Sequence, residues 1–101
     1  MVLNDINFNG DKIASFCKKH GIKQLALFGS VLSKKFTDKS DIDIMITLLP
    51  QYHCSYFDLL DIKAELENMT GREVDLVEKD SIKNPYRQKS IFENMQVIYD
   101  S

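Results

Sequence analysis

Apolar and polar residues alternate along the chain with periods that predict a series of helices and strands. Ile13, Phe16 and Cys17 recur at the i, i+3, i+4 spacing of one helical face. Basic residues fill the last turn, where positive charge suits the helix dipole, and Gly21 follows as a C-terminal stop. The pattern predicts an amphipathic helix from about Gly10 to His20, with Cys17 as a small core residue.

A compact apolar run ends at a Gly-Ser pair. Residues 23–28 finish in Leu-Ala-Leu-Phe, and their length and composition predict a buried strand. Gly29 ends this strand. Ser30 is a favourable N-cap residue, so a short helix is predicted to follow it and to carry Val31, Leu32 and Phe36.

The next apolar run, Asp41–Leu48, alternates strictly. Its isoleucines share one face of a predicted strand, which must be the core face, whereas Asp41, Asp43 and Met45 share the other. Two carboxylates that point the same way from an apolar strand repel each other, and burial adds to the penalty. A bound cation would compensate for this cost.

The second half of the chain predicts a long helix, a strand and a closing helix. Ser55 and Asp58 form a capping box before a stripe of core residues, and Gly71 ends that helix. The stretch Glu73–Val77 predicts a third strand, with Asp75 as another carboxylate within an apolar strand. A closing helix is predicted over residues 86–99, with its apolar face made by three residues, Ile91, Met95 and Ile98.

Composition narrows the class of protein. With 101 residues, 44% of them hydrophobic and 28% charged, residues 1–101 are expected to form a single small globular domain. A formal charge of −2 gives no reason to expect direct nucleic-acid binding. No apolar run approaches membrane-spanning length, the first residues lack the pattern of a signal peptide, and two distant cysteines favour a reducing compartment, so a cytoplasmic location is expected.

The paired aspartates are the first candidate for chemistry. Residues i and i+2 of a strand lie roughly 6.5–7 Å apart at Cα. Leaning side chains at that spacing can bracket two metal ions about 3.5–4 Å apart, and hard carboxylate oxygens suit Mg²⁺ with substrate phosphates. The plain alternative for Asp41 and Asp43 is a pair of surface aspartates at the start of a strand.

The Gly-Ser pair is the second candidate. A glycine between a strand and a helix lets the backbone approach a ligand, and a helix N-terminus offers N–H groups to an anion. Gly29 and Ser30 therefore suit a phosphate group. The alternative interpretation of this pair is an ordinary turn glycine followed by an N-cap serine.

The order and spacing of these features are more specific than either alone. Gly29-Ser30, ten residues and then Asp41-Ile42-Asp43 resembles the GS-x10-DxD signature of the DNA-polymerase-β-like nucleotidyltransferase superfamily. The small size and the later Val-Asp-Leu-Val strand with Asp75 resemble its minimal nucleotidyltransferase (MNT) branch. The resemblance runs from the first helix to the closing segment, so it covers most of the chain.

The resemblance implies an α+β fold of the polymerase-β-like nucleotidyltransferase type, with a small mixed β-sheet packed against helices in the order α-β-α-β-α-β-α. It implies that Gly29 and Ser30 hold the triphosphate of ATP and that Asp41 and Asp43 bind two Mg²⁺ ions. Asp75 would complete the metal site or take the proton of the attacking hydroxyl.

The family also implies a partner. Minimal members act as antitoxins of HEPN-domain ribonuclease toxins, some by transferring AMP to a toxin tyrosine. No membrane association is expected, and the oligomeric state, a homo-oligomer included, is left open. One residue departs from the family pattern: Val31 stands where relatives have an arginine beside the serine, and Lys34, Lys35 or Arg87 are candidates to replace its charge.

Two alternatives to protein adenylylation remain. The domain could be a non-catalytic nucleotide-binding module that neutralises its partner by steric contact. The absence of the family's arginine at position 31 favours this alternative. It could instead modify a small molecule or a nucleic acid, although such relatives carry further domains. Exposed aromatic residues would serve a partner interface, and the candidates are Tyr52, Tyr56, Phe57 and Tyr86.

Overall fold

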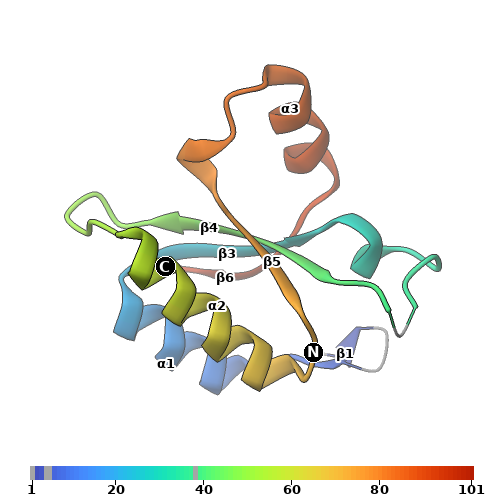
Figure 1. Cartoon of the computed structure of the whole chain (residues 1–101), viewed down its shortest axis with the longest axis horizontal. Helices are drawn as coiled ribbons and strands as arrows, with labels where there is room; N and C mark the ends of the chain where they lie inside the picture. The colour runs from blue at the N-terminus through green and yellow to red at the C-terminus, as the bar shows by residue number, and fades with distance from the viewer. Residues whose placement is uncertain (1, 4–5, 38) are drawn as a thin grey trace.

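The computed structural model describes residues 2–3, 6–37 and 39–101, which contain a four-stranded sheet with helices on both faces (Figure 1). Its strands lie in the order β5-β4-β3-β6, and their bounds are β3 Ile22–Phe28, β4 Ile42–Leu48, β5 Val74–Glu78 and β6 Gln96–Asp100. Strand β3 pairs antiparallel with both β4 and β6, whereas β4 and β5 run parallel. The sheet is therefore mixed, as the family resemblance implies.

In the described residues, three α-helices cover this sheet. Helices α1 (Gly10–His20) and α2 (Tyr56–Thr70) lie together on one face, and α3 (Pro85–Asn94) lies on the other (Figure 1). The predicted ends of α1 and α2 are confirmed: both C-caps are left-handed glycines, and Ser55 and Asp58 close the capping box before α2. In the described part of the chain, no helix combines the length and the apolar content needed to cross a membrane.

The core has two layers because the central strands are buried on both sides. The face toward α1 and α2 carries the isoleucines of β4, all 0% exposed, as predicted. The opposite face carries Met45 and Phe28, which pack with Ile82 and with Ile91 of α3. Helix α3 thus covers part of the face that the sequence assigns to the aspartates.

The prediction of a helix over residues 86–99 is wrong over its last five residues. Helix α3 ends at Asn94, Met95 takes an extended conformation with ψ 154°, and Gln96–Asp100 forms β6. Ile91 and Met95 face the same layer, but Ile98 packs on the other side of the sheet. The helical spacing of these three residues is coincidental, because pairing with β3 supplies the hydrogen bonds that make the last segment a strand.

The observed element order also differs from the predicted one at three further places. A short N-terminal hairpin, β1 (Val2–Leu3) and β2 (Ile6–Asn7), precedes α1 and was not predicted. The segment after Gly29 forms a single 3-10 turn, η1 (Gly29–Leu32), and Phe36 lies beyond it. A second 3-10 turn, η2 (Lys79–Ser81), follows β5.

Candidate active site

Asp43 and Asp75 lie side by side on the two parallel strands. The register pairs Ile42 with Val74 and Asp43 with Asp75, and the backbone N–H of Ile42 donates to the Glu73 carbonyl oxygen at 2.9 Å. Ile42 and Val74 are 0% and 2% exposed on the face of α1 and α2, so the next residue of each strand points to the face of α3. The structure therefore brings these two predicted site residues together.

Asp41 immediately precedes β4 and, by strand alternation, belongs to the same face. Asp41 and Asp75 are exposed, whereas Asp43 is partly buried. Burial raises the pKa of the Asp43 carboxyl, and the negative charge of Asp75, a hydrogen bond to it and the charge of Asp41 raise that pKa further. The three carboxylates thus share one electrostatic site in which negative charge is in excess.

Gly29 sits directly against this site. It follows Phe28, which is paired with Asp43, and its φ of 76° lies in the left-handed region that glycine adopts without strain. A Cβ placed on Gly29 would overlap the Oδ2 atom of Asp43. The backbone of the Gly-Ser corner and the carboxylate of the central aspartate are therefore in contact, and a phosphate held at the corner would lie beside an ion held by Asp43.

Ser30 lies inside the 3-10 turn, not at its N-cap. Phe28 occupies the N-cap position, and the carbonyl oxygen of Ser30 accepts from the backbone N–H and the hydroxyl of Ser33 at 2.9 and 3.0 Å. The predicted N-cap role of Ser30 is wrong, because one 3-10 turn replaces the expected helix and offers little helix dipole to an anion. Any phosphate binding here must rely on backbone N–H groups and the serine hydroxyl.

Val31 cannot be exchanged for a phosphate-binding side chain without rebuilding the core, because it is 0% exposed and belongs to the main apolar cluster. Positive charge near the site comes from helix α3 instead. The Arg87 guanidinium on α3 lies near enough to Asp43 to lower the pKa of that carboxyl, against the other influences. All three candidate replacements are exposed, and Arg87 is the one whose charge affects the pKa of Asp43, whereas Lys34 and Lys35 lie in the loop after η1.

The carboxylates suit a Mg²⁺ ion whose coordination shell is completed by ligands from the substrate. Among the residues that the structure describes, no three His, Cys, Asp or Glu side chains form a ready-made ligand group for a metal ion. Mg²⁺ in phosphoryl-transfer sites is held by one or two carboxylates, with phosphate oxygens and water as its other ligands. Asp43, with the negative charges of Asp41 and Asp75 beside it, meets that requirement.

Arg72 fixes the loop that leads into β4. Its guanidinium donates to the carbonyl oxygens of Thr37 and Ser40, the latter at 3.1 Å, and stacks on the Phe36 ring with 4.5 Å to the ring centroid. The loop between the Gly-Ser corner and Asp41 is therefore tied to the start of β5. The sequence offers no sign of this bond, because it joins residues that are far apart along the chain.

A groove of about 430 Å³ adjoins the site on the side of η1 and α3. It is lined by Phe28, Gly29, Leu32, Ser33, Ile91 and two polar residues of α3. Sequence reasoning missed this groove because the position of α3 over the sheet depends on long-range packing.

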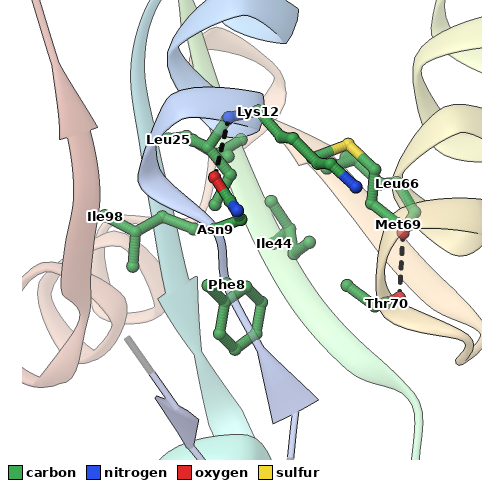
Figure 2. A pocket seen from close by; sticks show the side chains of 10 residues that line it. Phe8, Asn9, Lys12, Leu25, Ile44, Leu66, Met69, Thr70 and Ile98 are labelled. Atoms are coloured by element: carbon green, nitrogen blue, oxygen red, sulfur yellow. Dashed lines mark hydrogen bonds between the residues drawn. The ribbon is translucent and has the colours of Figure 1, made fainter.

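A second cavity, of about 220 Å³, lies on the opposite side of the sheet (Figure 2). Its wall is mainly apolar core: Phe8, Ile13, Leu25, Ile44, Leu66 and Met69. Two of the polar residues at its edge are engaged locally, since Asn9 caps α1 and the Thr70 hydroxyl donates to the Leu66 carbonyl oxygen at 2.8 Å. The carboxylates face away from this cavity, so it is separate from the candidate active site.

Residues 11–101 match the family model described as polymerase beta, nucleotidyltransferase. Among curated relatives, the "Putative protein adenylyltransferase MJ1379" of Methanocaldococcus jannaschii is 42% identical over 77 residues, 76% of this chain and 77% of the relative. A second protein of that organism with the same kind of name, MJ0128, is 42% identical over 80 residues, 77% of this chain and 78% of the relative.

Solved structures of low sequence identity share the fold. A crystal structure of a toxin-antitoxin with AMP-PNP has a TM-score of 0.73 at 19% identity and covers 93% of this chain and 75% of that chain. A tri-AMPylated Shewanella oneidensis HEPN toxin in complex with an MNT antitoxin gives a TM-score of 0.65 at 17% identity, over 91% of this chain and 70% of that chain. These likenesses confirm the predicted α+β fold with a mixed sheet.

Proposed function

The chain belongs to the polymerase beta nucleotidyltransferase family, and from this premise we propose that it transfers AMP from ATP to a hydroxyl group of a partner protein. The predicted class of enzyme, a nucleotidyltransferase, is confirmed by this membership. The observation that carries the proposal is the contact of Gly29 with Asp43, which in turn lies in register with Asp75.

In this proposal Asp41 and Asp43 hold two Mg²⁺ ions, and the backbone around Gly29 and Ser30 holds the triphosphate. When bound, Mg²⁺ would supply positive charge beside the phosphate oxygens and the leaving pyrophosphate. Arg87 adds the positive charge that Val31 does not supply.

Asp75 takes the role of general base. It is exposed and stands on β5, the edge strand, where an acceptor can approach from outside the sheet. The acceptor oxygen forms a bond to the α-phosphorus, the bond from that phosphorus to the bridging oxygen of pyrophosphate breaks, and the hydroxyl proton passes to the Asp75 carboxylate.

We further propose that the acceptor is a tyrosine of a HEPN-domain toxin and that the chain acts as its antitoxin. Relatives named as adenylyltransferases and a fold shared with toxin-antitoxin complexes support this assignment. Exposed aromatic residues support a partner interface: Tyr56 and Phe57 of α2 are 71% and 76% exposed, and Tyr86 of α3, on the other face of the sheet, is 85% exposed.

The test is transfer of labelled AMP to a candidate toxin. The protein is incubated with ATP labelled on the α-phosphate, Mg²⁺ and the product of a neighbouring HEPN gene, and the toxin is then analysed by mass spectrometry for an added AMP. Wild type should label the toxin, and an Asp41→Ala/Asp43→Ala variant should not. Equal labelling by that variant would remove the proposed metal site.

The second candidate function is neutralisation by steric contact alone, which the exposed aromatic residues of α2 favour. This alternative and the catalytic proposal predict different results for one variant. If binding suffices, the Asp41→Ala/Asp43→Ala variant will still protect cells from the toxin. Loss of protection in a variant that remains folded and still binds the toxin would exclude this alternative.

A further inference from the structure

The cavity on the α1 and α2 side of the sheet combines an apolar interior with polar groups at its mouth (Figure 2). The polar side chains come from the ends of two helices, Asn9 and Lys12 from the start of α1 and Thr70 from the end of α2. Sites for small ligands commonly pair an apolar wall with a few polar groups that orient the ligand. The apolar residues of the interior are at most 5% exposed: Phe8, Ile13, Leu25, Ile44 and Leu66.

The volume of the cavity sets the size of a ligand that could fill it. An engineered apolar cavity of about 150 Å³ in another protein binds benzene. By proportion, a cavity of about 220 Å³ holds roughly eight or nine non-hydrogen atoms. A short unbranched carbon chain meets this limit, whereas the longer acyl chains of bilayer lipids do not. The cavity therefore suits a free small molecule and not a membrane lipid.

The groups at the mouth favour an anion. The Asn9 side-chain oxygen accepts from the backbone N–H groups of Asp11 and Lys12 at 3.0 and 3.1 Å, so the group that Asn9 can offer to a ligand is its NH₂ donor. Lys12 is exposed, and within the described part of the chain its ammonium forms no salt bridge. No acidic residue is among the described residues that line the cavity. A carboxylate would accept hydrogen bonds from both the amide and the ammonium.

A groove of about 560 Å³ between α1 and α2 adjoins the mouth of the cavity. Lys12 and Met69 line both the cavity and the groove, and Figure 2 shows the Lys12 side chain extending from α1 toward Met69. The other lysine of the groove, Lys19, is paired with Glu65 at 2.8 Å. The groove thus gives a ligand a path to the cavity, with the Lys12 ammonium at the junction.

We propose that this cavity binds a free aliphatic carboxylate of about eight carbons, whose chain lies among the apolar residues and whose carboxylate lies on Lys12 and Asn9. The site is on the face of the sheet opposite to Asp43, so the inference goes beyond the proposed function and does not depend on it. A bound ligand would contact α1, α2 and the sheet together, and octanoate should therefore raise the melting temperature.

The first experiment measures the binding of octanoate, butyrate and octylamine by titration calorimetry. Octanoate should bind about ten-fold or more tightly than butyrate, because its longer chain buries more apolar surface. Octylamine has a chain of the same length and the opposite charge, and it should bind more weakly than octanoate by a similar factor. Equal affinities for octanoate and butyrate would show that no chain enters the cavity. Equal affinities for octanoate and octylamine would show that Lys12 does not select the charge, and either result overturns the proposal.

Lys12→Gln removes the charge at the mouth and keeps most of the side chain. It should weaken octanoate about 3- to 10-fold and should not weaken octylamine, because a charge-assisted hydrogen bond to the carboxylate is lost. Lys18→Gln is the matched control, since Lys18 is an exposed lysine of α1 that lines neither the cavity nor the groove. If both variants lose the same affinity, the protein attracts octanoate by general surface charge and the proposal is wrong.

Ile98→Phe tests the interior of the cavity. Ile98 lines it from β6 and is only partly buried, so the larger ring adds volume there without removing a core side chain. This variant should weaken octanoate about ten-fold or more, because the chain no longer fits. If octanoate does not bind wild type and Ile98→Phe weakens binding of the candidate toxin, the cavity receives a partner side chain and the carboxylate proposal is wrong.

Nuclear magnetic resonance of wild type gives a readout that needs no variant. Octanoate should shift the methyl signals of Leu25, Ile44 and Leu66, which line the cavity. It should leave those of Met45 and Ile91 unchanged, because these residues pack on the opposite face of the sheet. Shifts on that opposite face, or none at the three cavity residues, would overturn the proposal and would leave the proposed function untouched.

Discussion

Replacing Asp43 by asparagine should stabilise the ligand-free protein while it removes activity. The amide would keep the shape of the side chain but would remove the central charge of the carboxylate cluster. Neighbouring strands lie about 4.8 Å apart and a hydrogen bond links the Asp43 and Asp75 carboxyl groups, so their charge centres are separated by roughly 4–5 Å. At that distance the repulsion is about 1–2 kcal/mol for an effective dielectric constant between roughly 40 and 80. Asp43→Asn should raise the free energy of unfolding by this amount at neutral pH.

The effect has a defined pH dependence. The pKa of Asp43 is raised in the folded state above its ordinary value of 3.8. Below that ordinary value the residue is protonated in both states, and its charge costs nothing. As pH rises toward the raised pKa, the unfolded chain loses the proton first, so the wild type is progressively destabilised relative to the variant. The advantage of Asp43→Asn should therefore be absent at low pH and complete above the raised pKa.

Thermal unfolding at several pH values, without and with Mg²⁺ and ATP, measures both sides of the prediction. Near neutral pH the variant should melt roughly 4–8 °C higher for each kcal/mol gained. Added ligand should stabilise wild type only. Asp61→Asn, which changes an exposed aspartate of α2 outside the cluster, should stay within about 0.5 kcal/mol of wild type. If Asp43→Asn is neutral or destabilising at neutral pH while Asp61→Asn behaves as stated, the carboxylates do not repel each other, and the electrostatic basis of the metal site is wrong.

Three further variants examine other parts of the site. Gly29→Ala should abolish AMP transfer and destabilise the folded protein more than Gly71→Ala does. Both glycines have positive φ, but an added Cβ meets Asp43 only at Gly29. Chemical denaturation measures the stability of each variant, and a transfer assay measures its activity. Arg87→Ala should raise KM for ATP and shift the acidic limb of the pH–rate profile to higher pH, since Arg87 lowers the pKa of Asp43; an unchanged profile would contradict this. Arg72→Ala should cost about 1–3 kcal/mol of stability through two lost charge-assisted hydrogen bonds, with faster amide exchange in the loop before β4; equal protection there would show that Arg72 does not hold the loop.

The faces of the sheet could be predicted from the sequence because strand alternation is local. Ile42 and Val74 are apolar and their successors are aspartates, so the inward and outward faces of both strands follow from the residues themselves. The caps of α1 and α2 are local too, since Gly21, Gly71 and Ser55 act within one turn of their helices.

The remaining features depend on contacts between distant segments. The last segment reads as helix by its spacing, and only its pairing with β3 makes it a strand. The charge of Arg87 influences Asp43 because Ile91 packs α3 onto Phe28 and Met45, which no local pattern specifies. The N-cap role of Ser30 failed for a related reason, since Val31 enters the core and the chain turns away after Leu32.

The parallel pairing of β4 with β5 fixes the number of residues that can join α2 to β5. Only two residues, Arg72 and Glu73, separate the left-handed Gly71 from the start of β5. Gain or loss of one residue there would turn Asp75 toward the helices, into the place of Val74, which is 2% exposed. In a diverging lineage this short junction should therefore accept many amino-acid replacements but almost no single-residue insertions or deletions.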